Sequence, residues 1–483
     1  MSTNGKPNIL LIIADDFAND VALITDRSPE RRMYVMTDAG GPMHVGALPI
    51  LSTLLRCGLW FDQAWAQPAC SPTRASIYTG TWPWRNGVGS PANNPQLDPA
   101  LVTALPMLLG PEGYECGLFG KWHLGIAPGY RPVPDHGWVK HVGTLDGVIN
   151  AANNPCNIAN PDYENWCMED SDDYLNPTPT TVYATRVTVE EAGGWIAGLP
   201  VDTPWFATVA FHTPHDPFHV PPFGYQLPRG ATPINDEEKF NAAVQNLDAS
   251  VGRLLGTGAG PAMSSIAPDQ LENTVIIFIG DNGSASPIAT EEPKLTIHEG
   301  GVSVPLIVAD GQAVANEMSG ATPVPRFLEP GRLNRNNSYL VHAVDLYETI
   351  TEIAGVTAAL PPNIDSASLW RFASQPDLQP PTRQFNFSQY YTNAVQRATI
   401  RNLDYKLNYE HPNQWSLYAY WGREVPGLES GSAQDIFPTA PADVQAGVSN
   451  NAADNLNAPL DELILSGNYM IDDDPNTLWT DPR

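Results

Sequence analysis

Acidic and amide side chains follow two apolar segments of the sequence. Asp15 and Asp16 come directly after the apolar run 8–14, and Asp281 and Asn282 follow the run 274–279. Carboxylates at the end of a buried strand are costly unless their charge is compensated. Grouped carboxylate and amide oxygens suit a hard divalent cation, most simply Ca²⁺ or Mg²⁺. Taken singly, each residue is more typical of a turn or a cap, but the two strand ends of one sheet taken together favour a metal site.

Basic side chains recur at positions that could handle an anion and a proton. Lys121 and His123 lie two residues apart on one side of an extended or turning segment. His215 has a proline before it and another two residues after it, which restrict the backbone. A zinc cluster of His215 with the nearby His212 and His219 is disfavoured, because their intervals do not match a helical zinc motif.

Two further stretches carry reactive or charged residues in short patterns. A cysteine, a proline and an arginine alternate from Cys70 to Arg74, which by itself is equally typical of a buried cysteine before a proline turn. Lys294 precedes a Glu-Gly-Gly sequence at 299–301. A lysine in such a loop is usually on the surface, but this one follows the Asp281 tip closely enough to fold back over it.

Buried strands with polar ends would bring these residues together. The continuous apolar runs 8–14, 205–211 and 274–279 predict strands, and each is followed by polar residues at its carboxyl end. Ligands of open α/β sheets bind at that edge. Helical patterns occupy 48–55, 100–109, 185–196, 237–255 and 342–354. The alternation predicts a mainly parallel α/β sheet flanked by helices.

The chain length and composition changes suggest two domains. A chain of 483 residues exceeds the usual size of one core. Residues 150–180, rich in Asn, Pro and Asp, predict a surface insertion, and the proline-rich segment 360–382 resembles a linker. We expect a catalytic α/β domain over 1–383. A smaller C-terminal α+β domain with an antiparallel sheet is expected over 384–483, where 427–456 has an irregular pattern.

The charge balance limits the partners. The chain has 53 acidic and 25 basic residues, a net charge of −28, which repels nucleic acid and anionic membrane surfaces. We therefore expect no nucleic-acid and no membrane partner. An anion site in this chain must be built from local positive charge.

Five cysteines show no metal-type spacing, so zinc thiolate sites are not expected. Cys156 and Cys167 lie in the insertion and could pair under oxidising conditions, but reduced thiols are the default for a cytoplasmic chain. No signal peptide or membrane span precedes or follows the first strand, so the chain as written is expected in the cytoplasm. A chain trimmed of a signal peptide would instead be periplasmic or secreted.

These stretches, taken in order, resemble the blocks of the formylglycine-dependent type I sulfatases, arylsulfatase-like members of the alkaline phosphatase superfamily. The resemblance covers roughly residues 7–410 in colinear blocks. It implies an alkaline-phosphatase-like fold and oxidation of Cys70 to formylglycine by a maturation enzyme. The hydrate of that aldehyde is the nucleophile of the family. The family pattern usually has an arginine at the position of Ser303, so a support in that loop is expected to be missing.

The resemblance also implies a role for each motif residue. One Ca²⁺ is held by Asp15, Asp16, Asp281 and Asn282, with the modified Cys70 as a further ligand. Arg74 holds the hydrate, with Lys121 and His123 beside it, and His215 and Lys294 contact the sulfate and its leaving oxygen.

The implied reaction has two steps. One hydroxyl of the hydrate attacks sulfur while His215, with Lys294, protonates the departing alcohol. His123 then takes the proton of the second hydroxyl, sulfate leaves and the aldehyde returns. A serine lacks that second hydroxyl, which is a physical reason for the modification.

Three interpretations compete for the function. The first is hydrolysis of a small-molecule sulfate monoester. The second is a phosphonate monoester hydrolase or phosphodiesterase of the same superfamily, because tetrahedral phosphorus anions fit the same donors. The third is a non-catalytic protein that binds sulfated ligands, which would not need nucleophile, metal ligands and proton donors together. Four tryptophans near the motifs could stack on an aryl or sugar leaving group, although packing is the commoner role: Trp82, Trp84, Trp122 and Trp138.

Overall fold

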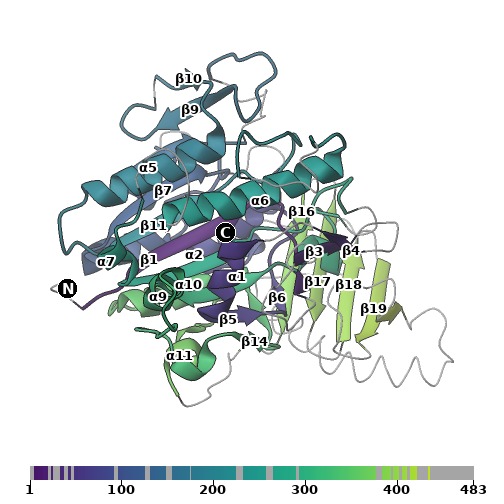
Figure 1. The fold of residues 1–483 in the computed structure, drawn as a ribbon. Helices are drawn as coiled ribbons and strands as arrows, with labels where there is room; N and C mark the ends of the chain where they lie inside the picture. The colour runs from purple at the N-terminus through teal and green to yellow at the C-terminus, as the bar shows by residue number, and fades with distance from the viewer. Residues whose placement is uncertain are drawn as a thin grey trace.

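A computed structural model gives the fold of the chain (Figure 1). It describes residues 5–19, 48–91, 96–125, 131–147, 155–174, 176–224, 232–256, 265–289, 293–376, 383, 385–392, 395–401, 405–410, 414–420 and 433–435, with three short strands between 23 and 44. Those three form a sheet of their own, β2 (Leu23–Ile24), β3 (Met33–Met36) and β4 (Pro42–His44). The irregular pattern expected over 427–456 lies almost wholly outside the described residues.

The main sheet has ten strands, five of which are adjacent and parallel at its centre. In spatial order the central strands are β8 (Lys140–Thr144), β7 (Glu115–Lys121), β11 (Trp205–Ala210), β1 (Asn8–Ala14) and β12 (Thr274–Gly280). Beyond β12 lie β13 (Leu306–Asp310), β5 (Gly58–Phe61) and β14 (Arg335–Asn337), and beyond β8 lie β9 (Trp166–Asp170) and β10 (Thr178–Thr180). Every residue of β1, β11 and β12 is buried, as continuous aliphatic runs require.

Helices cover both faces of this sheet, because the side chains of β1 alternate between two cores. Leu10 and Ile12 pack into one core, and Ile9 and Leu11 pack into the other. The first core is closed by α1 (Pro49–Arg56), α5 (Ala184–Gly198), α6 (Asp236–Leu254) and α9 (Gly311–Met318). The second is closed by α2 (Cys70–Thr79), α4 (Leu105–Leu109), α10 (Leu346–Ala354) and α11 (Trp370–Ser374). Shorter helices are α3 (Pro83–Asn86), α7 (Pro268–Leu271) and α8 (Glu299–Val302).

A second, antiparallel sheet lies near the C-terminal part of the chain, beside the main sheet in Figure 1. Its order is β16 (Asn386–Tyr391), β17 (Gln396–Arg401), β18 (Tyr405–Glu410), β19 (Gln414–Tyr420) and β20 (Ala433–Asp435). A two-stranded sheet of β6 (Ala64–Trp65) and β15 (Val341–His342) lies next to β16. This architecture confirms the predicted α/β fold with a smaller antiparallel sheet, while the domain limits at 383 and 384 stay a prediction.

A buried ionic cluster joins the second sheet to the main body of the molecule. Glu299 of α8 accepts a hydrogen bond from Trp65 Nε1 at 2.9 Å. The same carboxylate lies 3.4 Å from Arg401 of β17 and 3.4 Å from Lys406 of β18. The missing arginine at Ser303 was expected to leave this loop without support. Glu299 instead has basic partners from the second sheet.

Three expectations for local structure need correction. The helix expected over 100–109 covers only Leu105–Leu109, where Pro106 lies in the first turn. The segment 360–382 was expected to be a linker, yet its described part contains α11, which packs Phe372 into the core. Cys156 and Cys167 form a disulfide bond, where reduced thiols were the default expectation. Across the described part of the chain, no helix combines the length and apolarity needed to cross a bilayer.

Candidate active site

The carboxyl ends of four neighbouring parallel strands meet at one edge of the main sheet. Asp15 and Asp16 follow β1, and Asp281 and Asn282 follow β12, the strand beside it. The carbonyl of Ala14 accepts the Asp281 N–H at 2.9 Å, which fixes the two tips side by side. Lys121 is the last residue of β7. The segment 212–215 follows β11, which lies between β7 and β1 in the sheet. All of these side chains therefore lie at the edge where open α/β sheets bind ligands.

Cys70 is the first residue of α2. Ala69, which precedes it, makes no side-chain hydrogen bond to the first turn, so the partial positive charge of a helix N-terminus lies at position 70. Arg74 lies one turn further along and is completely buried. It donates to Asp281 Oδ2 from Nε at 3.0 Å and Nη2 at 2.7 Å, and to the Lys121 carbonyl from Nη1 at 2.8 Å. Arg74 thus ties α2 to both β12 and β7.

Lys121 and His123 both turn into the site from the end of β7. Lys121 Nζ forms an ion pair with the buried carboxylate of Asp15. His123 Nδ1 lies 3.1 Å from Cys70 Sγ, and its Nε2 lies 3.2 Å from Asp146 Oδ1. The imidazole is therefore held from both sides, between the predicted nucleophile and a carboxylate.

A glycine permits the bend that aims these two side chains. Gly120 has φ +99°, and a Cβ there would lie 2.0 Å from the Ala210 carbonyl oxygen of β11. His123 itself has φ +57°, a left-handed conformation that is uncommon outside glycine. Close packing against β11 and the positive φ both require a residue without a side chain at position 120.

His215 and Lys294 both approach the second carboxylate of the acidic tip, Asp16. Lys294 Nζ lies 2.6 Å from Asp16 Oδ1, so the loop that carries it does fold back over the strand ends. His215 Nε2 lies 3.7 Å from Asp16 Oδ2. Its Nδ1 lies 3.0 Å from Asp216 Oδ1, which orients the ring.

The acidic tip has the donor set of a cation site. Ligand atoms of Asp15, Asp16 and His215 all lie within 4.8 Å of one another. Asp15 Oδ1, Asp16 Oδ2 and Asn282 Oδ1 are buried and have no hydrogen-bond partner among the described residues. Buried oxygens of this kind are costly unless something binds them. These oxygens therefore fit a hard divalent cation, and the His215 ring lies beside them.

The histidine cluster that the sequence disfavoured does not form among His212, His215 and His219. His212 Nε2 hydrogen bonds with Thr144 Oγ1 at 2.7 Å, and His219 Nε2 hydrogen bonds with the Tyr183 hydroxyl at 2.8 Å. The partner in each of these contacts is an uncharged hydroxyl rather than a shared metal ion. The tryptophans considered as stacking surfaces are all buried, so packing is their role: Trp82, Trp84, Trp122 and Trp138.

Charge in the site shifts the pKa of two reactive groups. Burial would raise the pKa of the Cys70 thiol, but His123 and Lys121 outweigh it and hold that pKa well below its usual value. Burial would lower the pKa of His215, but Asp16 outweighs it and raises that pKa to about 9. The site thus stabilises an anion at position 70 and a proton on His215.

Two residues that the sequence did not reveal support the predicted ones. Asp146 contacts His123, as described above. Tyr163 lies in the insertion and donates its hydroxyl toward the carbonyls of His212, at 2.7 Å, and His215, at 2.8 Å. Asp146 follows the strand end of β8, a signal of the kind used for β1, but the run 140–144 is too polar to have predicted a strand. Nothing in the sequence near Tyr163 indicated its contact.

Comparisons with known proteins agree with this arrangement. A profile of the sulfatase family matches residues 7–356. A sulfatase of Formosa agariphila is 27% identical over 418 residues, which cover 74% of this chain and 70% of that protein. Human N-acetylgalactosamine-6-sulfatase is 26% identical over 391 residues, which cover 75% of this chain and 65% of the human protein. The chain thus spans about two thirds of the length of these curated relatives.

Solved structures share the fold. A sulfatase from Pseudoalteromonas sp. superposes with a TM-score of 0.60 and 21% identity over 89% of this chain and 81% of the other. A protein solved with its substrate D-glucosamine-2-N,6-O-disulfate gives a TM-score of 0.65 with 16% identity, over 98% of this chain and 99% of the other. The family profile covers most of the chain, and the acidic strand tips and the cysteine-led helix lie within its limits: the chain belongs to the sulfatase family.

Proposed function

We propose that this chain hydrolyses a small-molecule sulfate monoester, using as nucleophile the hydrate of a formylglycine made from Cys70. The observation that carries the proposal is the placement of Cys70 at the N-terminus of α2, 3.1 Å from His123 and among basic side chains at a strand-tip acidic cluster. A helix N-terminus and local cations offset the net charge of −28 for an anionic substrate. The nucleophile requires a formylglycine-generating maturation enzyme as a partner.

Different basic residues of the chain bind the sulfate group and the side chain at position 70. Lys121 lies beside Asp15 and Lys294 beside Asp16, so both ammonium groups are at the strand tips, where they can bind sulfate oxygens. Arg74 is fixed by Asp281 and the Lys121 carbonyl, and from there it holds the side chain at position 70. His215 carries a proton at neutral pH because of Asp16.

Proton transfers follow from these positions. In the first step, one hydroxyl at position 70 attacks sulfur in line with the ester oxygen, and His215 with Lys294 protonates the alcohol as it leaves. In the second step, His123 takes the proton of the other hydroxyl, the bond to the sulfate oxygen breaks, and sulfate departs as the aldehyde re-forms. Water then rehydrates the aldehyde.

The orphaned oxygens of Asp15, Asp16 and Asn282, with Asp281 and the modified Cys70, would hold one Ca²⁺. The ion would supply positive charge to the sulfate oxygens and to the hydrate. Two of these carboxylates already pair with lysines in the structure, so the ion and the lysines share the same anionic groups.

Sugar sulfates join aryl and alkyl sulfates as candidate substrates. One relative is named for N-acetylgalactosamine 6-sulfate, and one structural neighbour was solved with a disulfated glucosamine. The second candidate function is hydrolysis of a phosphonate monoester or phosphodiester, which the same donors would accept. A purely ligand-binding role is disfavoured by the predicted nucleophile lying in contact with a histidine base.

The disulfide bond indicates the kind of cellular compartment in which the protein is found. Disulfides persist in oxidising environments and are rare in the reducing cytosol. The Cys156–Cys167 bond therefore favours the periplasmic or secreted alternative over the cytoplasm.

Peptide mass spectrometry and parallel assays test the proposal. Protein from a host with a maturation enzyme should carry formylglycine at position 70 and should turn over aryl or sugar sulfates. Substrates for comparison are a phosphonate monoester and a phosphodiester of the same alcohol. An active preparation with only thiol at position 70, or a large preference for the phosphorus esters, contradicts it.

Removal of the metal gives a second test. Treatment with a chelator should abolish turnover and lower the melting temperature, and Ca²⁺ should restore both, because an ion bound only to the folded state stabilises it by about 4 kcal/mol at 1,000 times its Kd. A D281N variant should show a smaller Ca²⁺-dependent shift. Full activity after exhaustive chelation would contradict a calcium site.

A further inference from the structure

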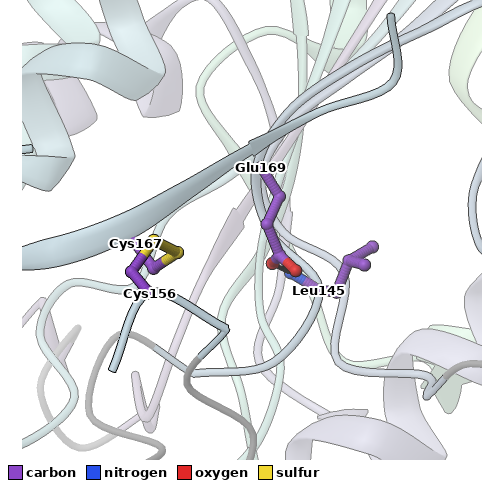
Figure 2. Close-up of a disulfide and its surroundings, with 4 residues drawn as sticks. All are labelled: Leu145, Cys156, Cys167 and Glu169. Atoms are coloured by element: carbon purple, nitrogen blue, oxygen red, sulfur yellow. Dashed lines mark hydrogen bonds between the residues drawn. A yellow bond between two sulfur atoms is a disulfide. The ribbon is translucent and has the colours of Figure 1, made fainter. Parts of the chain in front are cut away.

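The insertion sends a half-buried carboxylate toward the loop that holds His123. Glu169 lies on β9, opposite Gly143 of β8. Its Oε2 accepts the N–H of Leu145 at 2.5 Å, as Figure 2 shows. Leu145 belongs to the turn that follows β8, and the contact joins two segments 24 residues apart in sequence. Glu169 therefore fixes the backbone of that turn.

The same turn holds His123 in two ways. The Leu145 carbonyl accepts the His123 N–H at 3.1 Å, which sets the backbone of His123 in its left-handed conformation. The next residue, Asp146, places its carboxylate 3.2 Å from His123 Nε2. Thr144 Oγ1 donates to the Asp146 carbonyl and tightens the turn. Movement of the two residues 145 and 146 would thus move both supports of the imidazole.

Strand β9 is joined to β8 by a short ladder and by an ion pair between Lys140 and Asp170. It pairs with β8 through only two residue pairs, 142 with 170 and 143 with 169. The disulfide bond joins Cys167 of this strand to Cys156, and Cys167 lies two residues before Glu169 (Figure 2). Residues two apart on a strand point to the same face, so the covalent link and the carboxylate act on one side of β9.

We propose that Glu169 is a positioning residue for His123, acting through residues 145 and 146, and that the Cys156–Cys167 bond holds Glu169 in place. The inference rests on the proposed function, because it assigns a catalytic effect to a contact made outside the reacting atoms. Burial of Glu169 and the nearby Asp146 carboxylate raise the pKa of Glu169 to about 7. The hydrogen bond from the Leu145 N–H offsets part of the cost of burying the Glu169 carboxylate. Without this hydrogen bond, the side chain would no longer be held in its position.

The proposal has a kinetic signature, because His123 acts only in the second step. A variant slowed in that step loses kcat and KM together, and kcat/KM, which reports the first step, is retained. Product alcohol then appears in a burst that matches the enzyme concentration before the slow steady state. General damage to the fold would lower kcat/KM and give no burst.

Three variants of the mature enzyme separate these outcomes. E169A should lower kcat about tenfold, keep kcat/KM within about twofold, and show the burst. E169Q should retain a larger part of kcat, because its amide oxygen can still accept the Leu145 N–H. E164A removes an exposed glutamate of the same insertion and should match the wild type. A wild-type kcat in E169A, or an equal loss in kcat and kcat/KM, overturns the proposal.

A readout independent of turnover accompanies the kinetics. Hydrogen exchange of the peptide that spans 141–147 should be faster in E169A than in the wild type, because the Leu145 amide loses its acceptor. The C156S/C167S double variant should show the same exchange change and the same kinetic signature to a smaller degree. Unchanged exchange in both variants overturns the positioning role. A wild-type enzyme without sulfate-ester turnover refutes the proposed function instead, while the exchange result still decides the contact.

Discussion

Cys70 owes its proposed chemistry to three neighbours that act on one atom. The helix N-terminus, His123 and Lys121 all favour negative charge at that position, against the cost of burial. Arg74, one turn along, is locked by Asp281, so the helix cannot slide without breaking a buried ion pair. An oxygen nucleophile at position 70 would therefore be oriented and stabilised as an anion.

Replacement of Cys70 by serine isolates the need for the second hydroxyl. C70S should fold normally and lose at least about a thousandfold in kcat, because one hydroxyl can accept the sulfuryl group but cannot expel it as an aldehyde forms. Steady-state assay with an aryl sulfate and thermal melting measure the two properties. S76A, a buried serine later in α2, is the matched control and should keep its activity. Steady turnover by C70S would refute the hydrate mechanism.

Glu169 predicts a pH-dependent stability. Its pKa is about 7 in the folded protein and 4.5 ordinarily, so between these values the folded state keeps a proton that the unfolded chain releases. Stability then falls as pH rises through this window, by at most about 3 kcal/mol. The E169Q variant lacks this cost, so its advantage over the wild type should grow from pH 5 to pH 8 in urea unfolding. E164Q should show no such trend, and a constant E169Q difference would contradict the shift.

The sequence predicted those site residues whose own side chains are expected to bind or react. Asp15 and Asp281 were expected at one sheet edge from their place after apolar runs, and Lys294 from its short distance in sequence after Asp281. The structure brings the three together. Asp146 and Glu169 escaped prediction because each acts by a contact with a residue distant in sequence. A carboxylate that binds one backbone N–H leaves no pattern of its own.

At the scale of elements, the insertion is a structural part of the site and extends the main sheet. Its strand β9 continues the sheet beyond β8, and its Tyr163 reaches the carbonyls on either side of the segment 213–214. The sequence predicted an insertion from composition, but polar, proline-rich segments give no periodicity from which partners could be inferred. The buried strands β1, β11 and β12 were predicted within one residue, because short continuous apolar runs bounded by polar residues are typical of strands buried on both faces.

Tyr163 should matter most for substrates with poor leaving groups. Loss of its hydroxyl in Y163F frees the His215 segment, and His215 is the proposed acid for the departing alcohol. We expect kcat/KM to fall about tenfold for alkyl or sugar sulfates and by about twofold or less for nitrophenyl sulfate, whose leaving group needs no proton. Y114F removes a buried hydroxyl that donates to the Pro7 carbonyl instead, and it should affect neither substrate. Equal losses on both substrates would indicate general disruption.

The molecule as a whole repels an anionic substrate at a distance, while the candidate active site attracts it. Its net charge of −28 is spread over the chain, while the basic groups Arg74, Lys121, Lys294 and His215 gather at one sheet edge. This contrast could be predicted from composition and motif positions together. The docking of the second sheet through Glu299, Arg401 and Lys406 could not, because its residues are distant in sequence and their pattern is that of ordinary strands.

Repulsion by the net charge acts over a longer distance than attraction by the cations of the site, so added salt distinguishes the two effects. The Debye length falls from about 30 Å at 0.01 M to about 8 Å at 0.15 M ionic strength, so added NaCl screens the distant carboxylates more than the buried cations. For a sulfate monoester, kcat/KM should therefore rise several-fold over this range, mostly through KM. The uncharged viscogen sucrose, at matched osmolality, is the control. A fall in kcat/KM with NaCl would mean that the site's own positive charge, rather than the net charge, governs approach of the substrate.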